Sequence, residues 1–198
     1  MPLVSAFGQA ALAFAVAVAW WLIATRGREG FLPWVGLSSP RIERPRLFWT
    51  IAASSLLAFS VVGVVTLEAM KDAPGLSVAA FRGLGWAAVP GVAAYAIVQT
   101  ALSEEIVFRG LLGKNLIRRW GFGVGNALQA LAFGALHGLL FAPALGWVPA
   151  TALAMFTAAI GWVFGELNER LSDGSLLPSW GLHAVSNLIA GCWAAFAW

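Results

Sequence analysis

Hydrophobic residues are arranged along this chain in long uninterrupted blocks. Stretches free of Asp, Glu, Lys and Arg span residues 1–25, 47–67, 83–103, 120–165 and 174–198. Each is as long as, or longer than, the roughly 20 apolar helical residues that cross a ~30 Å hydrocarbon layer. Only helices and closed barrels satisfy the backbone in lipid, and none of these stretches shows strand-like alternation. The pattern predicts an all-α, polytopic membrane protein.

The fourth stretch is long enough for two spans. Pro143, Gly146 and Pro149 lie near its middle and favour a tight turn there. We therefore expect the whole chain, 1–198, to form one integral-membrane domain, a helical bundle with an intramembrane cavity. Its six transmembrane helices are predicted over residues 4–24, 48–67, 86–108, 121–140, 147–166 and 179–197.

The composition also indicates a membrane protein and argues against a nucleic-acid partner. The chain is 60% hydrophobic and 11% charged, and its mean hydropathy is +0.82. Soluble domains carry roughly a quarter charged residues. The net charge of +3 does not indicate a nucleic-acid partner, because the basic residues gather in short loops between apolar runs. The expected surroundings are a lipid bilayer.

Loop charge predicts an orientation. The loops after the first, third and fifth helices hold most of the Lys and Arg residues, whereas the opposite side has only Lys71 and Arg82. Because basic loops stay cytoplasmic, we expect the odd-numbered loops inside and both termini outside. The short, Ala-, Gly- and Trp-rich chain suggests a bacterial inner (plasma) membrane. The basic residues of the odd loops are Arg26, Arg28, Arg41, Arg44, Arg46, Lys114, Arg118, Arg119 and Arg170.

Few groups inside the predicted spans can ionise or form strong hydrogen bonds. Intramembrane ionisable residues are costly and usually face a bundle interior or a water-filled cavity, so they are functional candidates. Both histidines of the chain belong to this set. Its members are Glu104, Glu105, Arg109, His137, His183 and Asn187.

The two adjacent glutamates differ in whether a partner is available on their own helix. Glu105 and Arg109 are an i,i+4 pair in the favourable order, so each lowers the cost of burying the other. Glu104 points about 100° away around the helix and needs another partner. It lies nearly as far before Trp120 as His137 lies after it, so an antiparallel hairpin brings the two level. A carboxylate facing an imidazole there suits water activation; the alternative is a structural hydrogen bond.

His183 and Asn187 are also four residues apart and share one helix face. As two neutral donors they could hold a substrate carbonyl and stabilise an oxyanion. The alternative is that they bind helices together. Helices 121–140 and 179–197 place His137 and His183 toward opposite membrane faces. Their meeting requires the last helix to begin deep in the bundle.

The sequence lacks the residues that other classes of membrane protease require. The chain has no H-E-x-x-H zinc motif. Asp72 and Asp173 lie in loops, so an intramembrane aspartyl dyad is excluded. The single cysteine, Cys192, excludes an internal disulfide and is interpreted as a small buried hydrophobe. Ser103 and Ser186 are interpreted as structural.

Three motifs together resemble a known family. E-E-I-V-F-R at 104–109 matches E-E-x-x-x-R, F-G-A-L-H at 133–137 matches F-x-x-x-H, and H-A-V-S-N at 183–187 matches H-x-x-x-N. In this order on successive helices, the chain resembles the CPBP family of glutamic intramembrane proteases. That family includes type II CAAX prenyl endopeptidases and bacteriocin-processing or self-immunity (Abi-like) relatives. The resemblance covers 85–198, and residues 1–84 add two spans and a basic loop.

The resemblance implies a metal-independent endopeptidase without a cofactor. Glu104 would be the general base that activates water, and His137 would position that water. His183 and Asn187 would form the oxyanion site. The supporting residues would be Glu105, Arg109 and Phe133.

The implied substrate is a membrane-anchored protein or peptide, such as a prenylated tail, a bacteriocin precursor or a C-terminal sorting signal. Two alternatives from other classes stay open at this point. One is a non-catalytic transporter or scaffold that uses the buried Glu and His groups for protons or a ligand. The other is a zinc enzyme with Glu104, His137 and His183 as ligands.

Overall fold

The computed structural model describes residues 2–73 and 76–197, with side chains from residue 5 onward; residues 1, 74, 75 and 198 lie outside the described part. Every regular element within those ranges is helical, which confirms the predicted all-α class. Two short elements, α2 (Phe31–Val35) and a 3₁₀ turn at Ser77–Phe81, lie in loops. The long elements are α1 (Pro2–Thr25), α3 (Pro45–Ala69), the helix that contains α4 (Val89–Ala93), α5 (Lys114–Leu145), α6 (Trp147–Leu171) and α7 (Leu177–Ala197).

The third predicted helix is longer than its charges indicated. It runs from a 3₁₀ turn at Gly85–Ala88 through α4 and two π-helical segments, Ala94–Leu102 and Glu105–Gly113, into the first residues of α5. We call residues 85–120 the π-rich helix. The predicted end at residue 108 was wrong, because Arg109 is buried and Lys114 is neutralised by Glu169 at 2.8 Å.

Two glycines divide the long apolar region where turns were predicted. Gly121 interrupts α5 with φ 77° and ψ 167°, so the chain reverses next to Trp120. Gly146 has φ 79° between α5 and α6. Positive φ values of this size favour glycine because it lacks a Cβ. The predicted span 121–140 therefore continues to Leu145.

Small residues let α5 and α6 pack closely. A Cβ built on Gly134 would lie 2.7 Å from the Cβ of Ala158, and one on Gly138 would lie 2.8 Å from that of Ala154. Transmembrane helices associate through such small-residue contacts, since lipid supplies no hydrophobic drive. The helices α5 and α6 therefore form one closely packed side of the bundle.

Length and apolarity qualify four helical stretches as membrane spans: Ser5–Thr25, Pro45–Ala69, Gly85–Leu145 and Trp147–Leu171. Gly121 divides the third into two legs. α7 has 21 residues, a spanning length, although its Ser, His and Asn residues reduce its apolarity. With α7 the bundle has the six predicted long helices.

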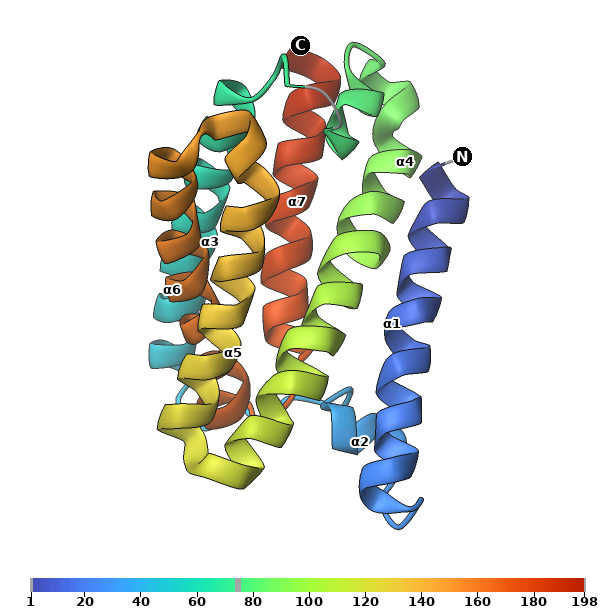
Figure 1. Cartoon of the computed structure of the whole chain (residues 1–198), viewed down its shortest axis with the longest axis vertical. Coiled ribbons are helices and arrows are strands. Elements are labelled where there is room, and N and C mark those ends of the chain that lie inside the picture. The colour runs from blue at the N-terminus through green and yellow to red at the C-terminus, as the bar shows by residue number, and fades with distance from the viewer. Residues whose placement is uncertain (1, 74–75, 198) are drawn as a thin grey trace.

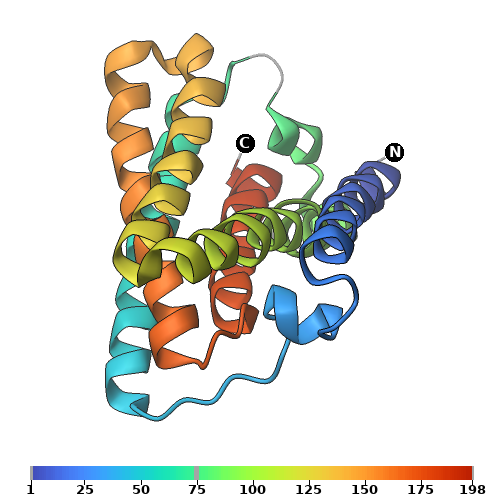
Figure 2. The same ribbon diagram turned by 60° about the horizontal axis from the view of Figure 1, so that its bottom comes forward.

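The loops are sorted to the two ends of the bundle. The connections after α1, after the π-rich helix and after α6 lie together at the lower end in Figure 1, and both termini lie at the upper end. We call the lower end the arginine-rich end, since apart from Lys71, Arg82 and the buried Arg109 it holds every Lys and Arg of the chain. Figure 2 shows α1 on the outer side of the π-rich helix, and α3, α5 and α6 on the far side of α7.

Exposed tryptophans mark both membrane borders. Trp86 and Trp147 are 82% and 72% exposed near the upper end, and Trp49 and Trp120 are 63% and 49% exposed near the arginine-rich end. Amphipathic indoles favour such interfacial positions.

Candidate active site

The backbone around the two glutamates is unusual. Ser103 and Glu104 sit between the two π-helical segments of the π-rich helix. π-helical turns use i→i+5 bonding, are rare, and occur frequently at functional sites. Because a π-helical turn contains more residues, the rotation from one side chain to the next is smaller than the 100° of an α-helix. Both glutamates can therefore point into the bundle.

Glu105 is completely buried and its carboxylate is fully partnered. Its Oε1 lies 3.2 Å from Nη1 of Arg109 and 3.0 Å from Nδ1 of His183. Its Oε2 accepts a 2.6 Å hydrogen bond from Oγ of Ser179, which in turn accepts one from Nδ2 of Asn168 at 2.7 Å. The predicted i,i+4 pairing of Glu105 with Arg109 is present, and it extends into α6 and α7.

Arg109 is held between aromatic rings. Its guanidinium carbon lies 4.1 Å from the ring centre of Phe133 and 5.4 Å from that of Phe164. Cation–π attraction is stronger where the cation is desolvated, and Arg109 is only 3% exposed. Phe133, singled out by its motif, therefore packs directly on the cation that neutralises Glu105.

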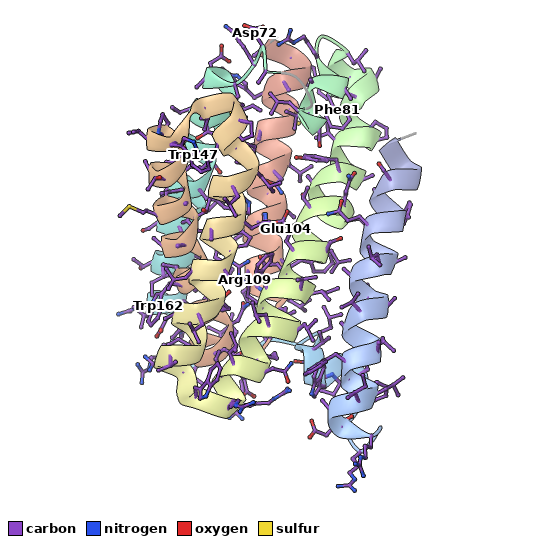
Figure 3. The ribbon with its side chains drawn as sticks, in the orientation of Figure 1. Asp72, Phe81, Glu104, Arg109, Trp147 and Trp162 are labelled. Carbon is purple, nitrogen blue, oxygen red and sulfur yellow. The ribbon has the colours of Figure 1, made fainter. Side chains whose placement is uncertain are left out.

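Glu104 has a different environment. Its Oε2 lies 3.9 Å from Nε2 of His137 and 3.8 Å from Nε2 of His183, and none of the described residues forms a hydrogen bond with it. The two histidines meet because α7 begins well above the lower end of α5 (Figure 1). Figure 3 places Glu104 near mid-height of the bundle, with Arg109 below it.

The hydrogen bonds of the two rings determine which nitrogen faces Glu104 as an acceptor. Nδ1 of His137 lies 2.9 Å from the carbonyl oxygen of Phe133, and Nδ1 of His183 bonds Glu105. Carbonyl and carboxylate oxygens only accept, so each Nδ1 carries the proton. In the neutral rings, both Nε2 atoms therefore present lone pairs toward Glu104. His183 can donate from Nε2 only as an imidazolium.

Asn187 projects from α7 one turn above His183. Its Nδ2 donates a 2.7 Å hydrogen bond to Oγ1 of Thr100 on the π-rich helix. The amide has a second N–H, which this bond leaves available.

The four predicted catalytic residues share one cavity of about 440 Å³. Its remaining lining is apolar or neutral and comes from α1, α3, the loop and 3₁₀ turn after α3, the π-rich helix, α5, α6 and α7. Within the described residues, no group of three or more His, Cys, Asp and Glu is arranged to hold a metal ion. The residues that line the cavity and that the sequence had singled out are Glu104, His137, His183 and Asn187.

The sequence reasoning missed three polar residues of the site. Thr100 lies four residues before Glu104, and Ser179 lies four before His183, so helical spacing could have identified both. Asn168 had no such signal, since it lies beyond the predicted span 147–166, beside the charged residues of the following loop. It is 1% exposed and bonds Ser179.

Comparison with known proteins agrees with this arrangement. A family model described as "Type II CAAX prenyl endopeptidase Rce1-like" matches residues 85–189, just over half of the chain. No curated protein and no solved structure matches the chain. The matched segment contains the motifs of Glu104, His137 and Asn187, and it selects a protease over a transporter or scaffold. The chain therefore belongs to the Rce1-like family of type II CAAX prenyl endopeptidases, and it is an integral membrane protease.

Proposed function

We propose that the protein is a metal-independent, glutamate-dependent endopeptidase in which Glu104 activates the hydrolytic water. The observation that carries this proposal is the position of Glu104 Oε2, which is unpartnered and lies 3.9 Å and 3.8 Å from two imidazole Nε2 atoms. These separations exceed direct hydrogen-bond lengths of about 2.7–3.2 Å. They suit a water held between the carboxylate and the rings.

The chemical step follows from this arrangement. Glu104 accepts a proton from the water while the water oxygen forms a bond to the substrate carbonyl carbon. His137, anchored through Nδ1 to the backbone, orients the water because its Nε2 accepts a hydrogen bond from the second O–H, which stays on the oxygen. The carbonyl oxygen becomes an oxyanion. When the C–N bond breaks, the proton on Glu104 passes to the leaving nitrogen, which gives a carboxylic acid and an amine.

The oxyanion is assigned to His183 and Asn187. In this assignment His183 carries a hydrogen on Nε2 as well as on Nδ1, so its Nε2–H and the second N–H of Asn187 are two donors on one face of the cavity. Charge is conserved, since Glu104 becomes neutral as the oxyanion forms. Donors fixed in a low-dielectric site stabilise such an anion strongly.

Glu105 and Arg109 are positioning residues in this proposal. The carboxylate of Glu105 fixes the orientation of the His183 ring through Nδ1. Arg109 neutralises that carboxylate and contacts the same oxygen, Oε1, as His183 does. Neither lines the cavity, so neither touches the substrate.

A membrane-anchored protein or peptide is the proposed substrate. The cavity lining has no charged residue other than Glu104 and the histidines. The residues on both sides of the scissile bond are therefore expected to be uncharged.

The test uses purified protein and a library of membrane-anchored and lipidated peptides, with and without a chelator. Wild type should cleave a subset of the library, and Glu104→Gln should not. The matched control is Glu43→Gln, an exposed glutamate at the arginine-rich end. Normal cleavage by Glu104→Gln would overturn the proposed base, and loss of cleavage with the chelator would favour a zinc enzyme.

A further inference from the structure

The helices around the cavity contribute two chemically different sets of residues. The π-rich helix and α7 supply most of its polar groups, among them Glu104 and Asn187. The other set comes from α3, α5 and α6, which lie together on the far side of α7 (Figure 2). Apart from His137, Thr66 and Thr157, every residue that these three helices contribute is apolar or glycine. A bound substrate therefore meets an apolar surface beside the catalytic groups.

α3 lines the cavity with one face of the helix. Counted from Phe59, its lining residues follow the spacing i, i+3, i+4, i+7 and i+8, which places them on one side. The intervening Val61 and Val65 are 53% and 64% exposed, as expected for the opposite face. Gly63 is the middle member of the lining series. That series consists of Phe59, Val62, Gly63, Thr66 and Leu67.

Phe59 brings this face of α3 next to the reacting groups. Its ring centre lies 5.4 Å from that of His183, with 53° between the ring planes. It also lies 6.0 Å from the ring centre of Phe164 at 72°, the edge-to-face arrangement that aromatic pairs favour. Because Phe164 is fully buried, the Phe59 ring rests on the core of the bundle and borders the cavity beside the proposed oxyanion donor.

Gly63 leaves open space one helical turn further along α3. A Cβ built on Gly63 would meet no heavy atom within 4 Å outside its own stretch of helix. Its packing therefore differs from that of Gly134 and Gly138, where a Cβ would collide with α6. Glycine in a helix interior costs about 0.5–1 kcal/mol relative to alanine. Since no neighbouring helix requires Gly63 to be small, what its missing side chain provides is volume in the cavity that it lines.

We propose that Phe59 and Gly63 form a size-selecting subsite for one apolar side chain of the substrate, on a residue that flanks the scissile bond. This inference rests on the proposed function, because it assigns the selectivity of the same site. With the scissile carbonyl held by His183 and Asn187, the neighbouring side chain lies over the Phe59 ring and extends into the space beside Gly63. α3 lies outside the matched residues 85–189, so this selectivity belongs to the part of the chain that the family model does not cover.

The chemistry of the subsite sets the expected selectivity. A charged side chain bound there would lose its hydration without gaining a partner. In an apolar pocket, one methylene too many or too few changes discrimination between substrates by about 10–200-fold. A larger residue at Gly63 should therefore exclude bulky substrate side chains, and a smaller residue at Phe59 should admit them.

The first test compares cleavage specificity. A membrane-anchored peptide that wild type cleaves is varied at each residue beside the scissile bond, through alanine, leucine and phenylalanine. Gly63→Leu should lose at least about tenfold in kcat/KM for the leucine and phenylalanine peptides and keep the wild-type value for the alanine peptide. Phe59→Ala should shift the preference toward phenylalanine.

Gly181→Leu is the matched control for Gly63→Leu. A Cβ on Gly181 also meets no atom within 4 Å, and Gly181 lies on α7, two residues before His183, without lining the cavity. Its specificity profile should equal that of wild type. A wild-type profile for Gly63→Leu, or an equal loss for all peptides, would overturn the inference.

The second test does not require proteolysis. Gly63→Cys and Gly181→Cys are made in a Cys192→Ala background, and the purified proteins react with methyl and benzyl methanethiosulfonate. Gly63→Cys should react with the methyl reagent at least about tenfold faster than with the benzyl reagent, and adding Phe59→Ala should remove most of that difference. Gly181→Cys should show no such dependence on Phe59. A size preference at Gly63→Cys that Phe59→Ala leaves unchanged would contradict the inference.

The two proposals fail separately in these experiments. If wild type cleaves none of the peptides while the reagents reveal the size limit at Gly63→Cys, the catalytic proposal fails and the subsite stands. If cleavage depends on Glu104 but its specificity is unchanged in Gly63→Leu, the subsite is wrong and the catalytic proposal stands.

Discussion

Two adjacent carboxylates of this protein occupy opposite kinds of environment. Glu105 faces the closed side of the site, where Arg109, Ser179 and His183 satisfy both of its oxygens. Glu104 faces the cavity, with two imidazoles nearly 4 Å away and no hydrogen bond to Oε2. A saturated buried ion is fixed in its charge state and geometry. An unsaturated carboxylate beside a cavity can take a proton from water, so the contrast supports the proposed structural role of Glu105 and the proposed chemical role of Glu104.

The largest predicted effect is a loss of stability when the buried cation beside Glu105 is removed. Arg109→Met should lower the free energy of unfolding by about 3–5 kcal/mol, because it leaves the Glu105 carboxylate buried without its cation. Thermal unfolding in detergent, followed by tryptophan fluorescence, measures the change. Arg119→Met, at the membrane surface, is the control and should change stability by less than about 0.5 kcal/mol. Equal stabilities for the two variants would mean that the ion pair does not hold the site.

The next largest effect is a loss of turnover when a residue that lines the cavity is changed. Asn187→Ala should reduce kcat about 10²–10³-fold, as expected for loss of one oxyanion donor, with a small change in KM. The neighbouring Ser186→Ala is the control, since Ser186 is buried but does not line the cavity. A change in KM alone would assign Asn187 to substrate binding instead.

A smaller effect on stability is expected from the hydrogen bond between Ser179 and Glu105. Ser179→Ala removes the 2.6 Å hydrogen bond to Glu105. Hydrogen bonds to charged groups contribute about 1.5–3 kcal/mol, so stability should fall by that amount. Ser172→Ala is a matched control, because the buried Oγ of Ser172 has no hydrogen-bond partner. If both serine variants lose the same stability, cavity formation rather than the hydrogen bond is responsible.

Much of the fold followed from the apolar blocks, because lipid leaves helices as the main option for an apolar chain of this length. The breaks at Gly121 and Gly146 agreed with the Trp120 border and with the Pro–Gly turn signals. The end of the third helix was misplaced, since a charge inside a span looks like a loop until its partners are known. Lys114 pairs with Glu169 on α6, and Arg109 pairs with Glu105 one turn earlier and packs against aromatic rings from α5 and α6.

The arrangement of the site was predictable where two of its residues lie one helical turn apart on the same helix. Glu105 with Arg109 and His183 with Asn187 are of this kind. The π-helical backbone and the deep start of α7 were not predictable, because both depend on packing between helices. These two features bring His183 near Glu104. Asn168 was missed for the same reason, since its hydrogen-bond partner Ser179 belongs to another helix.

The most direct test of the division between the two glutamates measures turnover and melting temperature for Glu104→Gln and Glu105→Gln beside wild type. Glu104→Gln should lose about 10²–10⁴-fold in kcat, the range for a general base, and melt at or above the wild-type temperature. Glu105→Gln should melt lower, because it leaves Arg109 without its carboxylate, and it should retain more turnover than Glu104→Gln. Full activity in Glu104→Gln, or greater loss of turnover in Glu105→Gln at unchanged melting temperature, would contradict the account.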